Sequence, residues 1–137
     1  MYAMVREFLE RLGSGDELIE YSTGDKRIAM AVLLFRVVTA DGKIRSNELK
    51  RYRQILEDEL EIPPDEIDLF ERVVRDESEA ERSLFPFTAI VSKMPFETKR
   101  HILQLMRDLS VADSELHEFE INLVARTAEL LGIGLDD

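Results

Sequence analysis

The sequence predicts an all-α protein that folds as a compact bundle of about seven helices. Apolar residues recur at helical spacing through most of the chain, and turn or capping residues separate these stretches. No stretch shows the strict alternation of apolar and polar residues that a half-buried strand requires. These observations together favour helices, and not a sheet, as the framework of the fold.

The chain begins with a predicted short amphipathic helix and a linker. One helix face carries the apolar residues Val5, Phe8, Leu9 and Leu12, and Gly13-Ser14-Gly15 ends the helix. The run from Ile28 to Val38 is apolar all around a helix, which predicts a central helix that is buried on every side. Two buried strands are the alternative, but no turn residues divide the run from its helical neighbours.

Turn signals bound the next two predicted helices. Asp41-Gly42 ends the central helix, and Ser46 or Asn47 can cap its successor. That successor has an apolar face made of Leu49, Tyr52, Leu56 and Leu60. Pro63-Pro64 then starts a further helix, because proline is favoured in a first turn. Its inner stripe consists of Ile67, Phe70, Val73 and Val74.

Three more helices are predicted in the remaining chain. The segment Ser78-Glu79-Ala80-Glu81 matches a capping box, and it opens a helix that carries Leu84, Phe87, Val91 and Met94. Pro86 either kinks this helix or starts it. Pro95 begins the next helix, which carries Ile102, Leu105, Met106 and Leu109. The last helix, from about His117 to Leu131, is predicted to bury Ile121, Val124, Ala128 and Leu131, and Gly132 closes it.

Length and composition indicate one globular domain. A chain of 137 residues with 45% hydrophobic residues can build a substantial core. We expect an N-terminal helix and linker in residues 1–25 and a helical domain in residues 26–133. The sequence contains no cysteine, which excludes disulfides, thiolate zinc sites and cysteine nucleophiles.

The charge and the apolar runs limit the partners. The net charge of −11, with a pI of about 4.7, disfavours nucleic acid and anionic membranes, because both are bound through Lys and Arg. The N-terminus lacks the pattern of a signal peptide, and the longest apolar run, Ile28 to Phe35, is too short to span a bilayer. We therefore expect a soluble, cytoplasmic protein that does not insert into membranes.

Acidic residues crowd the stretch from Glu57 to Glu71, which holds no Lys or Arg. Such a stretch is typical of a solvated face that keeps a protein soluble. The alternative is a surface that docks a basic protein partner.

One stretch of the sequence occurs twice. Residues 39–48 read TADGKIRSNE, and residues 111–120 read VADSELHEFE. In each copy two acids lie seven positions apart (48 − 41 = 7; 120 − 113 = 7), and the copies are offset by 72 residues (113 − 41 = 72). Each copy joins a strongly apolar helix to an amphipathic one, so two helix-loop-helix units are expected, at about 26–60 and 97–131. If the units pack antiparallel, both loops reach the same end of the bundle.

The chemistry of the repeated stretch points to a cation. The first copy resembles the second half of an EF-hand calcium loop, where Gly makes the turn and a final Glu closes on the ion. The first half of the calcium loop is not matched, because its ligand positions fall on Val37 and Thr39, and on Leu109 and Val111 in the second copy. Two converging loops would still offer four carboxylates, which suit calcium, magnesium or manganese. These carboxylates are Asp41, Glu48, Asp113 and Glu120.

Each of these acids also has an explanation that needs no metal. A Glu in the first turn of a helix, as expected for Glu48 and Glu120, is favoured by the macrodipole by about 0.3–1 kcal/mol. Asp41 followed by Gly42 is ordinary turn chemistry. However, Asp41 and Asp113 follow helices, where the dipole disfavours an acid, and a turn needs no Glu seven residues later.

The doubled Ala-Asp-Gly-x-Ile-x-x-x-Glu pattern and the closing Glu129-Leu130-Leu131-Gly132 resemble the TerB-like domain, named for tellurite-resistance proteins. The resemblance covers about Ile28 to Ile133, so residues 26–133 are assigned to it. It implies a seven-helix bundle with two pseudo-symmetric halves and a role in stress-response or membrane-associated complexes. It also implies an acidic metal site at Asp41, Glu48, Asp113 and Glu120. Ser114 stands where the family prefers Gly, so the second loop is expected to turn less sharply.

We therefore predict a non-enzymatic TerB-like module that has a divalent-cation site and protein partners. A metal-independent adaptor that recruits a partner through its acidic surface is the alternative, and a metal-assisted hydrolase is a third. Neither histidine favours catalysis, because His101 is expected on a helix surface and His117 at a helix cap. A di-iron carboxylate site is excluded, because Thr98 and Ser114 stand where its motif requires glutamates.

Overall fold

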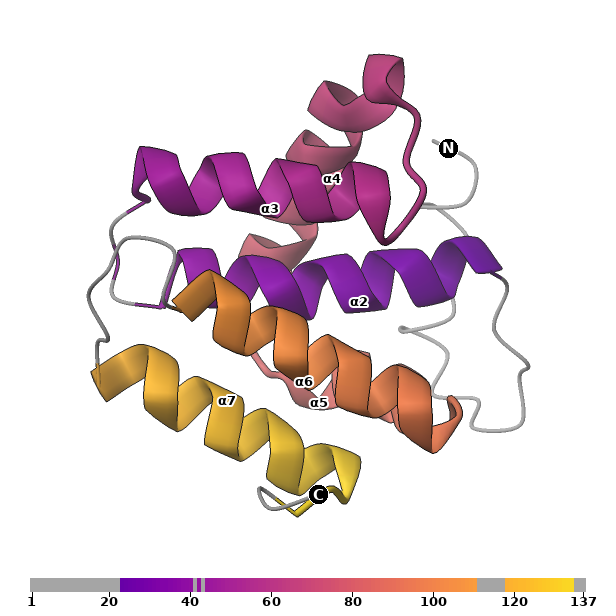
Figure 1. Ribbon diagram of the computed structural model, residues 1–137, viewed down its shortest axis with the longest axis vertical. Helices are drawn as coiled ribbons and strands as arrows, with labels where there is room; N and C mark the ends of the chain where they lie inside the picture. Colours follow the sequence, from indigo (N-terminus) through magenta and orange to yellow (C-terminus); the bar gives the residue numbers. More distant parts are fainter. Residues whose placement is uncertain (1–22, 41, 43, 111–117, 135–137) are drawn as a thin grey trace.

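The structure is a computed structural model that describes residues 23–40, 42, 44–110 and 118–134 (Figure 1). Over these residues it contains six α-helices, one short 3-10 helix and no strand, which confirms the all-α prediction. The helix predicted around Val5 to Leu12 lies outside the described residues. The elements are α2 (Thr23–Val38), α3 (Ser46–Asp58), the 3-10 helix η1 (Pro64–Glu66), α4 (Ile67–Ala80), α5 (Phe85–Val91), α6 (Phe96–Ser110) and α7 (Glu118–Leu131).

Helix α2 forms the centre of the bundle, as its apolar run predicts. It contacts α3, α4, α5, α6 and α7, and every residue from 31 to 35 is buried. In Figure 1, α3, α6 and α7 lie along α2, whereas α4 crosses behind it. A helix that is apolar all round can bury its whole surface only if other helices surround it, so its composition sets the topology.

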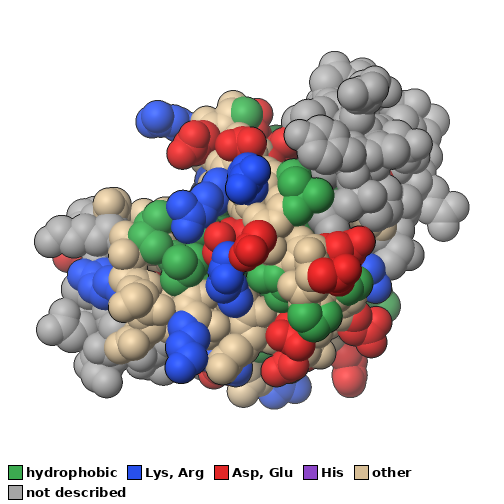
Figure 2. Space-filling view, turned by 90° about the horizontal axis from the view of Figure 1, so that it is seen from above, with side chains coloured by type: hydrophobic (Ala, Val, Ile, Leu, Met, Phe, Trp, Pro, Cys, Tyr) green, Lys and Arg blue, Asp and Glu red, His purple; other side chains and the backbone are tan. Residues whose placement is uncertain are grey.

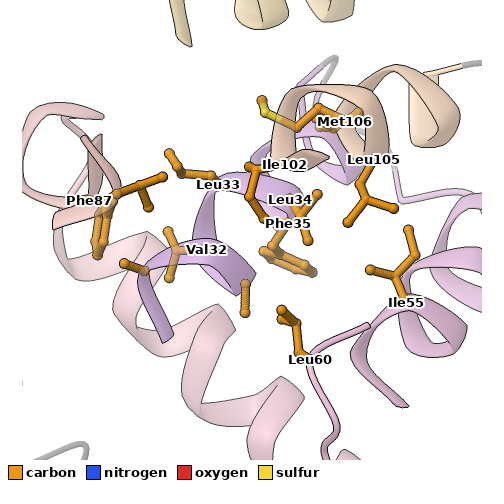
Figure 3. Packing of buried hydrophobic residues seen from close by; sticks show 14 of the residues in the cluster. Val32, Leu33, Leu34, Phe35, Ile55, Leu60, Phe87, Ile102, Leu105 and Met106 are labelled. Atoms are coloured by element: carbon orange, nitrogen blue, oxygen red, sulfur yellow. The ribbon is translucent and has the colours of Figure 1, made fainter. Parts of the chain in front are cut away.

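The core consists of side chains that α2 shares with its neighbours. Figure 3 shows Leu33 of α2 between Phe87 of α5 and Ile102 of α6, and Leu34 of α2 on the other side of Ile102, toward Ile55 of α3. All five side chains have at most 2% of their surface exposed. Burial of each such side chain contributes roughly 1.5–3 kcal/mol, which makes this cluster the main source of stability.

The structure settles the role of Pro86 and corrects the capping box proposed at residues 78–81. Pro86 lies in the first turn of α5, where its missing N–H leaves no helical hydrogen bond unmade, so it starts the helix. Ser78 lies inside α4 and does not open the following helix, so that prediction was wrong. Its hydroxyl oxygen instead accepts a hydrogen bond from Arg36 Nε at 2.7 Å. Arg36 is distant in sequence, and for this reason the local pattern was misleading.

The predicted cap of α3 was also wrong. The N-cap residue is Arg45, whose backbone is extended, and no side chain caps the helix there. Ser46 is the first helical residue, one position too late to act as the N-cap. The acidic residue in the first turn is Glu48, which is where the helix dipole favours a negative charge.

Helix α7 ends as predicted, but one of its four predicted core positions is exposed. The N–H of Gly132, at φ +73°, donates to Glu129 O at 3.1 Å, and the N–H of Ile133 donates to Ala128 O at 3.0 Å. These two bonds form the Schellman motif that a C-terminal Gly permits. Ile121 was predicted to be buried but is 48% exposed, because the helix turns Glu120 inward in its place. The other predicted core positions of α7 are buried: Val124, Ala128 and Leu131.

None of the described helices combines the length and the apolar composition that crossing a membrane requires.

Candidate functional site

Two of the four predicted metal ligands lie within the described residues. Glu48 and Glu120 both lie in the first turn of a helix, α3 and α7 respectively, and both side chains are fully buried at 0% exposure. Asp41 and Asp113 lie outside the described residues. The structure therefore defines the surroundings of the two glutamates only.

Both glutamates lie at the same end of the bundle. Figure 1 shows that α2 and α6 end, and α3 and α7 begin, on the left side of the view. Contacts of α2 with α3, α6 and α7, and of α6 with α3 and α7, confirm that these four helices are neighbours. The helix bounds repeat the offset of the motif, since α2 and α6 end 72 residues apart (110 − 38 = 72) and α3 and α7 begin 72 residues apart (118 − 46 = 72).

The burial of these glutamates is more than the helix dipole requires. A carboxylate at an exposed helix start already gains the dipole interaction, whereas removing it from water carries a desolvation penalty. Each glutamate begins the inward face of its helix, and most of the buried residues on that face in the following turns are apolar. This face continues through Tyr52, Ile55 and Leu56 in α3, and through Val124, Thr127 and Ala128 in α7.

A basic residue that the sequence analysis did not single out lies against one of the glutamates. Arg45 Nη1 is 3.5 Å from Glu48 Oε1, and the Arg45 side chain is 26% exposed. The two residues are three positions apart at the start of a helix, and side chains at this spacing lie close together. The sequence alone could therefore have predicted this contact. The local electrostatics at Glu48 therefore include a guanidinium as well as the helix start.

The described side chains do not complete a metal site by themselves. No group of three or more His, Asp or Glu side chains in the described ranges is arranged to hold an ion, and Asp41 and Asp113 are outside those ranges. A shared site would therefore have to combine the two buried glutamates with ligands from the two loops.

One histidine, His101 of α6, lies within the described residues. It contacts the C-terminal end of α3, whereas Glu48 lies at the start of that helix. His101 Nε2 is 2.9 Å from Glu59 Oε2, and both side chains are partly exposed on the surface. Glu59 caps the C-terminal end of α3, whereas Glu48 lies in its first turn. This pair joins α6 to α3 on the surface. His117 is outside the described residues.

Part of the acidic stretch from Glu57 to Glu71 forms ion pairs within the bundle. Arg53 Nε lies 3.2 Å from Glu71 Oε1, and the same guanidinium also binds Asp68. Glu71 is buried, so this part of the stretch fixes α4 to α3. Figure 2 shows acidic side chains gathered toward the right of the view and basic ones mainly to the left and centre. The surface is therefore mixed in charge on this face.

Comparison with protein families identifies the chain. The family model described as Tellurite resistance protein TerB matches residues 27–137. Curated proteins and solved structures gave no match. The matched segment includes both copies of the acidic motif and every described helix apart from the first residues of α2. The chain belongs to the TerB family.

Proposed function

We propose that this protein is a non-enzymatic TerB-like module that binds one divalent cation between its two acidic loops. The observation that carries the proposal is the matched placement of Glu48 and Glu120. Each is fully buried in the first turn of its helix, and the two helices begin at one end of the bundle.

The chemistry of the four acids suits a hard cation. Glu48 and Glu120 supply two carboxylates from the helix starts, and Asp41 and Asp113 supply two from the loops. Calcium, magnesium and manganese all prefer oxygen ligands, and a divalent charge offsets the repulsion between carboxylates. In this proposal the two helix-loop-helix units are pseudo-symmetric halves, and the cation holds them together.

The proposed cellular role follows from the family. Membership in a family described by tellurite resistance supports a place in a stress-response complex, in which this chain contacts other proteins. Binding of a cation would stabilise the folded bundle, and it would thereby increase the fraction of the protein that is folded and able to contact partners.

A metal-independent adaptor is the second candidate, and the Arg45–Glu48 contact of 3.5 Å favours it. That contact gives Glu48 a positive neighbour from the chain itself. In this reading, the loop acids shape turns and helix starts, and exposed acids such as Glu57, Asp58 and Asp65 recruit a basic partner.

Calorimetric titration distinguishes the two functions. Calcium, magnesium and manganese are each titrated into the wild type, into Glu48→Gln with Glu120→Gln, and into Asp41→Asn with Asp113→Asn. The control is Glu57→Gln with Glu129→Gln, a pair with the same 72-residue offset (129 − 57 = 72) whose side chains are exposed. Circular dichroism verifies that each variant is folded.

The cation function predicts saturable heat for at least one metal in the wild type and the control, and a loss of that heat in both site variants. Negligible heat in the wild type, or equal heat in all proteins, contradicts the cation site and leaves the adaptor.

A further inference from the structure

A groove of about 540 Å³ lies between the end of α2 and the C-terminal half of α4. It is separate from the two buried glutamates, although it reaches the segment that connects α2 with α3. Among the described residues that line it are Phe35, Arg36, Ile44, Arg75, Glu79 and Arg82. Ile44 is 46% exposed there, so the groove has an accessible apolar side chain.

The charges of the described residues that line the groove are mainly opposite to the net charge of the chain. Among these described residues are three arginines and one glutamate, whereas the whole chain has a net charge of −11. Because a chain with a net charge of −11 repels anions overall, a local excess of guanidinium groups favours the approach of an acidic ligand at this place.

The three arginines differ in how their donors are used. Arg36 donates to Ser78 Oγ, Ser78 O, Glu81 O and Arg82 O, so its guanidinium is occupied in holding the end of α4. It contributes charge to the groove but few donors.

Arg82 and the terminal nitrogens of Arg75 remain available as donors, whereas Arg75 Nε is buried. Arg75 lies over the Phe35 ring, 5.6 Å from its centroid, and its Nη2 is 3.9 Å from Glu71 Oε2, which is too long for a hydrogen bond. Stacking on Phe35 holds the guanidinium in place. The Arg82 side chain is exposed, and only its backbone oxygen is used, by Arg36.

The spacing of these two arginines fits an extended peptide. They are seven positions apart, which corresponds to about 10 Å along a helix. The real separation along the chain is somewhat larger, because α4 ends at Ala80 and Glu81 is extended. An extended chain covers such a distance in three or four residues, since it advances about 3.3 Å per residue.

We propose that this groove binds an extended acidic segment of a protein partner. Two carboxylates of that segment, three or four residues apart, pair with Arg75 and Arg82, and an apolar side chain between them packs against Ile44. Arginine pairs with carboxylates through two parallel hydrogen bonds, which gives direction as well as charge. A peptide fits better than a small molecule, because the exposed rim at Ile44, Glu79 and Arg82 leaves the groove open to solvent.

The test uses a defined probe. The probe is a fluorescein-labelled, capped peptide in which two glutamates flank two or three leucines, and its binding to the folded protein is followed by fluorescence anisotropy. The same peptide with glutamine in place of glutamate is the control ligand. Binding is measured with and without EDTA, so that any effect of a bound cation is separated from the groove.

We expect a Kd below about 1 mM for the glutamate peptide, weaker binding as salt is raised, and no binding of the glutamine peptide. Arg82→Glu should weaken binding by about tenfold or more, because it reverses a charge in the groove. Arg72→Glu makes the same change on an exposed part of α4 outside the groove and should alter the Kd by less than about twofold.

Amide chemical shifts locate the bound peptide independently. The largest changes on addition of the glutamate peptide should fall on Ile44, Arg75 and Arg82. The proposal is overturned by an absence of binding at about 1 mM, by equal binding of the glutamine peptide, or by equal losses in Arg82→Glu and Arg72→Glu.

Discussion

The Tyr52 hydroxyl donates a hydrogen bond of 2.9 Å to the carbonyl oxygen of Ala31 and so joins α3 to the middle of α2. The side chain is fully buried, and its ring lies 5.4 Å from that of Phe35. The Ala31 carbonyl already accepts a hydrogen bond within its own helix and has a second lone pair for the Tyr52 hydroxyl. The bond is therefore needed mainly by the hydroxyl, which is a polar group inside the core.

Removal of this hydroxyl should lower the stability of the protein. Tyr52→Phe keeps the ring and deletes the hydrogen bond, so we expect the free energy of unfolding to fall by about 1 kcal/mol. Urea denaturation followed by circular dichroism measures the change. Tyr52→Ala, which also empties the site, should cost about 3–5 kcal/mol. Equal stability of Tyr52→Phe and wild type would show that the bond adds nothing.

Arg36 should be the most sensitive arginine in the described part of the protein. Its guanidinium donates to Ser78 Oγ at 2.7 Å, to Ser78 O at 3.2 Å, to Arg82 O at 2.7 Å and also to Glu81 O. It also lies 5.7 Å from the centroid of the Phe87 ring. The partial burial that this position requires lowers the pKa of Arg36, against a smaller opposing effect of Glu81.

We expect Arg36→Met to lower the free energy of unfolding by about 2–4 kcal/mol, because several carbonyls at the end of α4 lose a charged donor. Arg36→Lys should restore only part of the loss, since an ammonium cannot reproduce the planar fork. Arg72→Met, a change at an exposed position of α4, should stay within about 0.5 kcal/mol of wild type. Chemical denaturation of the three variants decides the matter, and a similar small effect for Arg36→Met and Arg72→Met would refute the anchoring role.

Glu77 should make stability depend on pH. Desolvation by burial raises the pKa of Glu77, and the nearby Glu81 raises it further. A raised pKa in the folded state means that its stabilising contribution is present below the unfolded pKa, about 4.3, and is lost as pH rises through the folded value. At neutral pH the buried charge therefore opposes folding.

Glu77→Gln should consequently be more stable than the wild type at neutral pH, and the difference should vanish toward pH ~4. Thermal denaturation over this pH range tests the prediction. Glu79→Gln, an exposed change two residues away, is the control and should leave stability within about 0.5 kcal/mol of wild type. A constant difference between Glu77→Gln and wild type at all pH values would contradict the titration of Glu77.

Glu61 has a positive φ of 57°, a backbone conformation that favours glycine. It follows the end of α3, where the N–H of Ile62 donates to Leu56 O at 3.0 Å. Its side chain is 81% exposed and lies 3.7 Å from Arg27, an ion pair of little energetic value at such exposure.

We therefore expect Glu61→Gly to raise the melting temperature, with a gain in stability of up to about 1 kcal/mol. Gly132, at φ +73° after α7, provides the opposite case, and Gly132→Ala should lower stability by about 1 kcal/mol. Calorimetric melting of both variants measures these changes. A decrease for Glu61→Gly would show that the Arg27 contact outweighs the backbone strain.

Much of the fold follows from local properties of the sequence. The apolar run from Ile28 to Val38 determined a central helix, because a helix that is apolar on every side is fully buried only when other helices surround it. Gly132 determined where α7 ends, because it readily adopts the positive φ that the closing turn requires. The repeated motif, with its constant offset, also predicted that α3 and α7 each carry an acid in the first turn.

Only the tertiary structure decided which groups meet across the bundle. The sequence placed Glu48 and Glu120 at helix starts, but the docking of α3 and α7 determined that both carboxylates are buried and that Ile121 is exposed. Likewise, no local pattern relates Arg36 to Ser78, because 42 positions separate them. Local sequence fixes the conformation of each segment, whereas the rotation of a helix about its axis depends on the combined packing of all its neighbours.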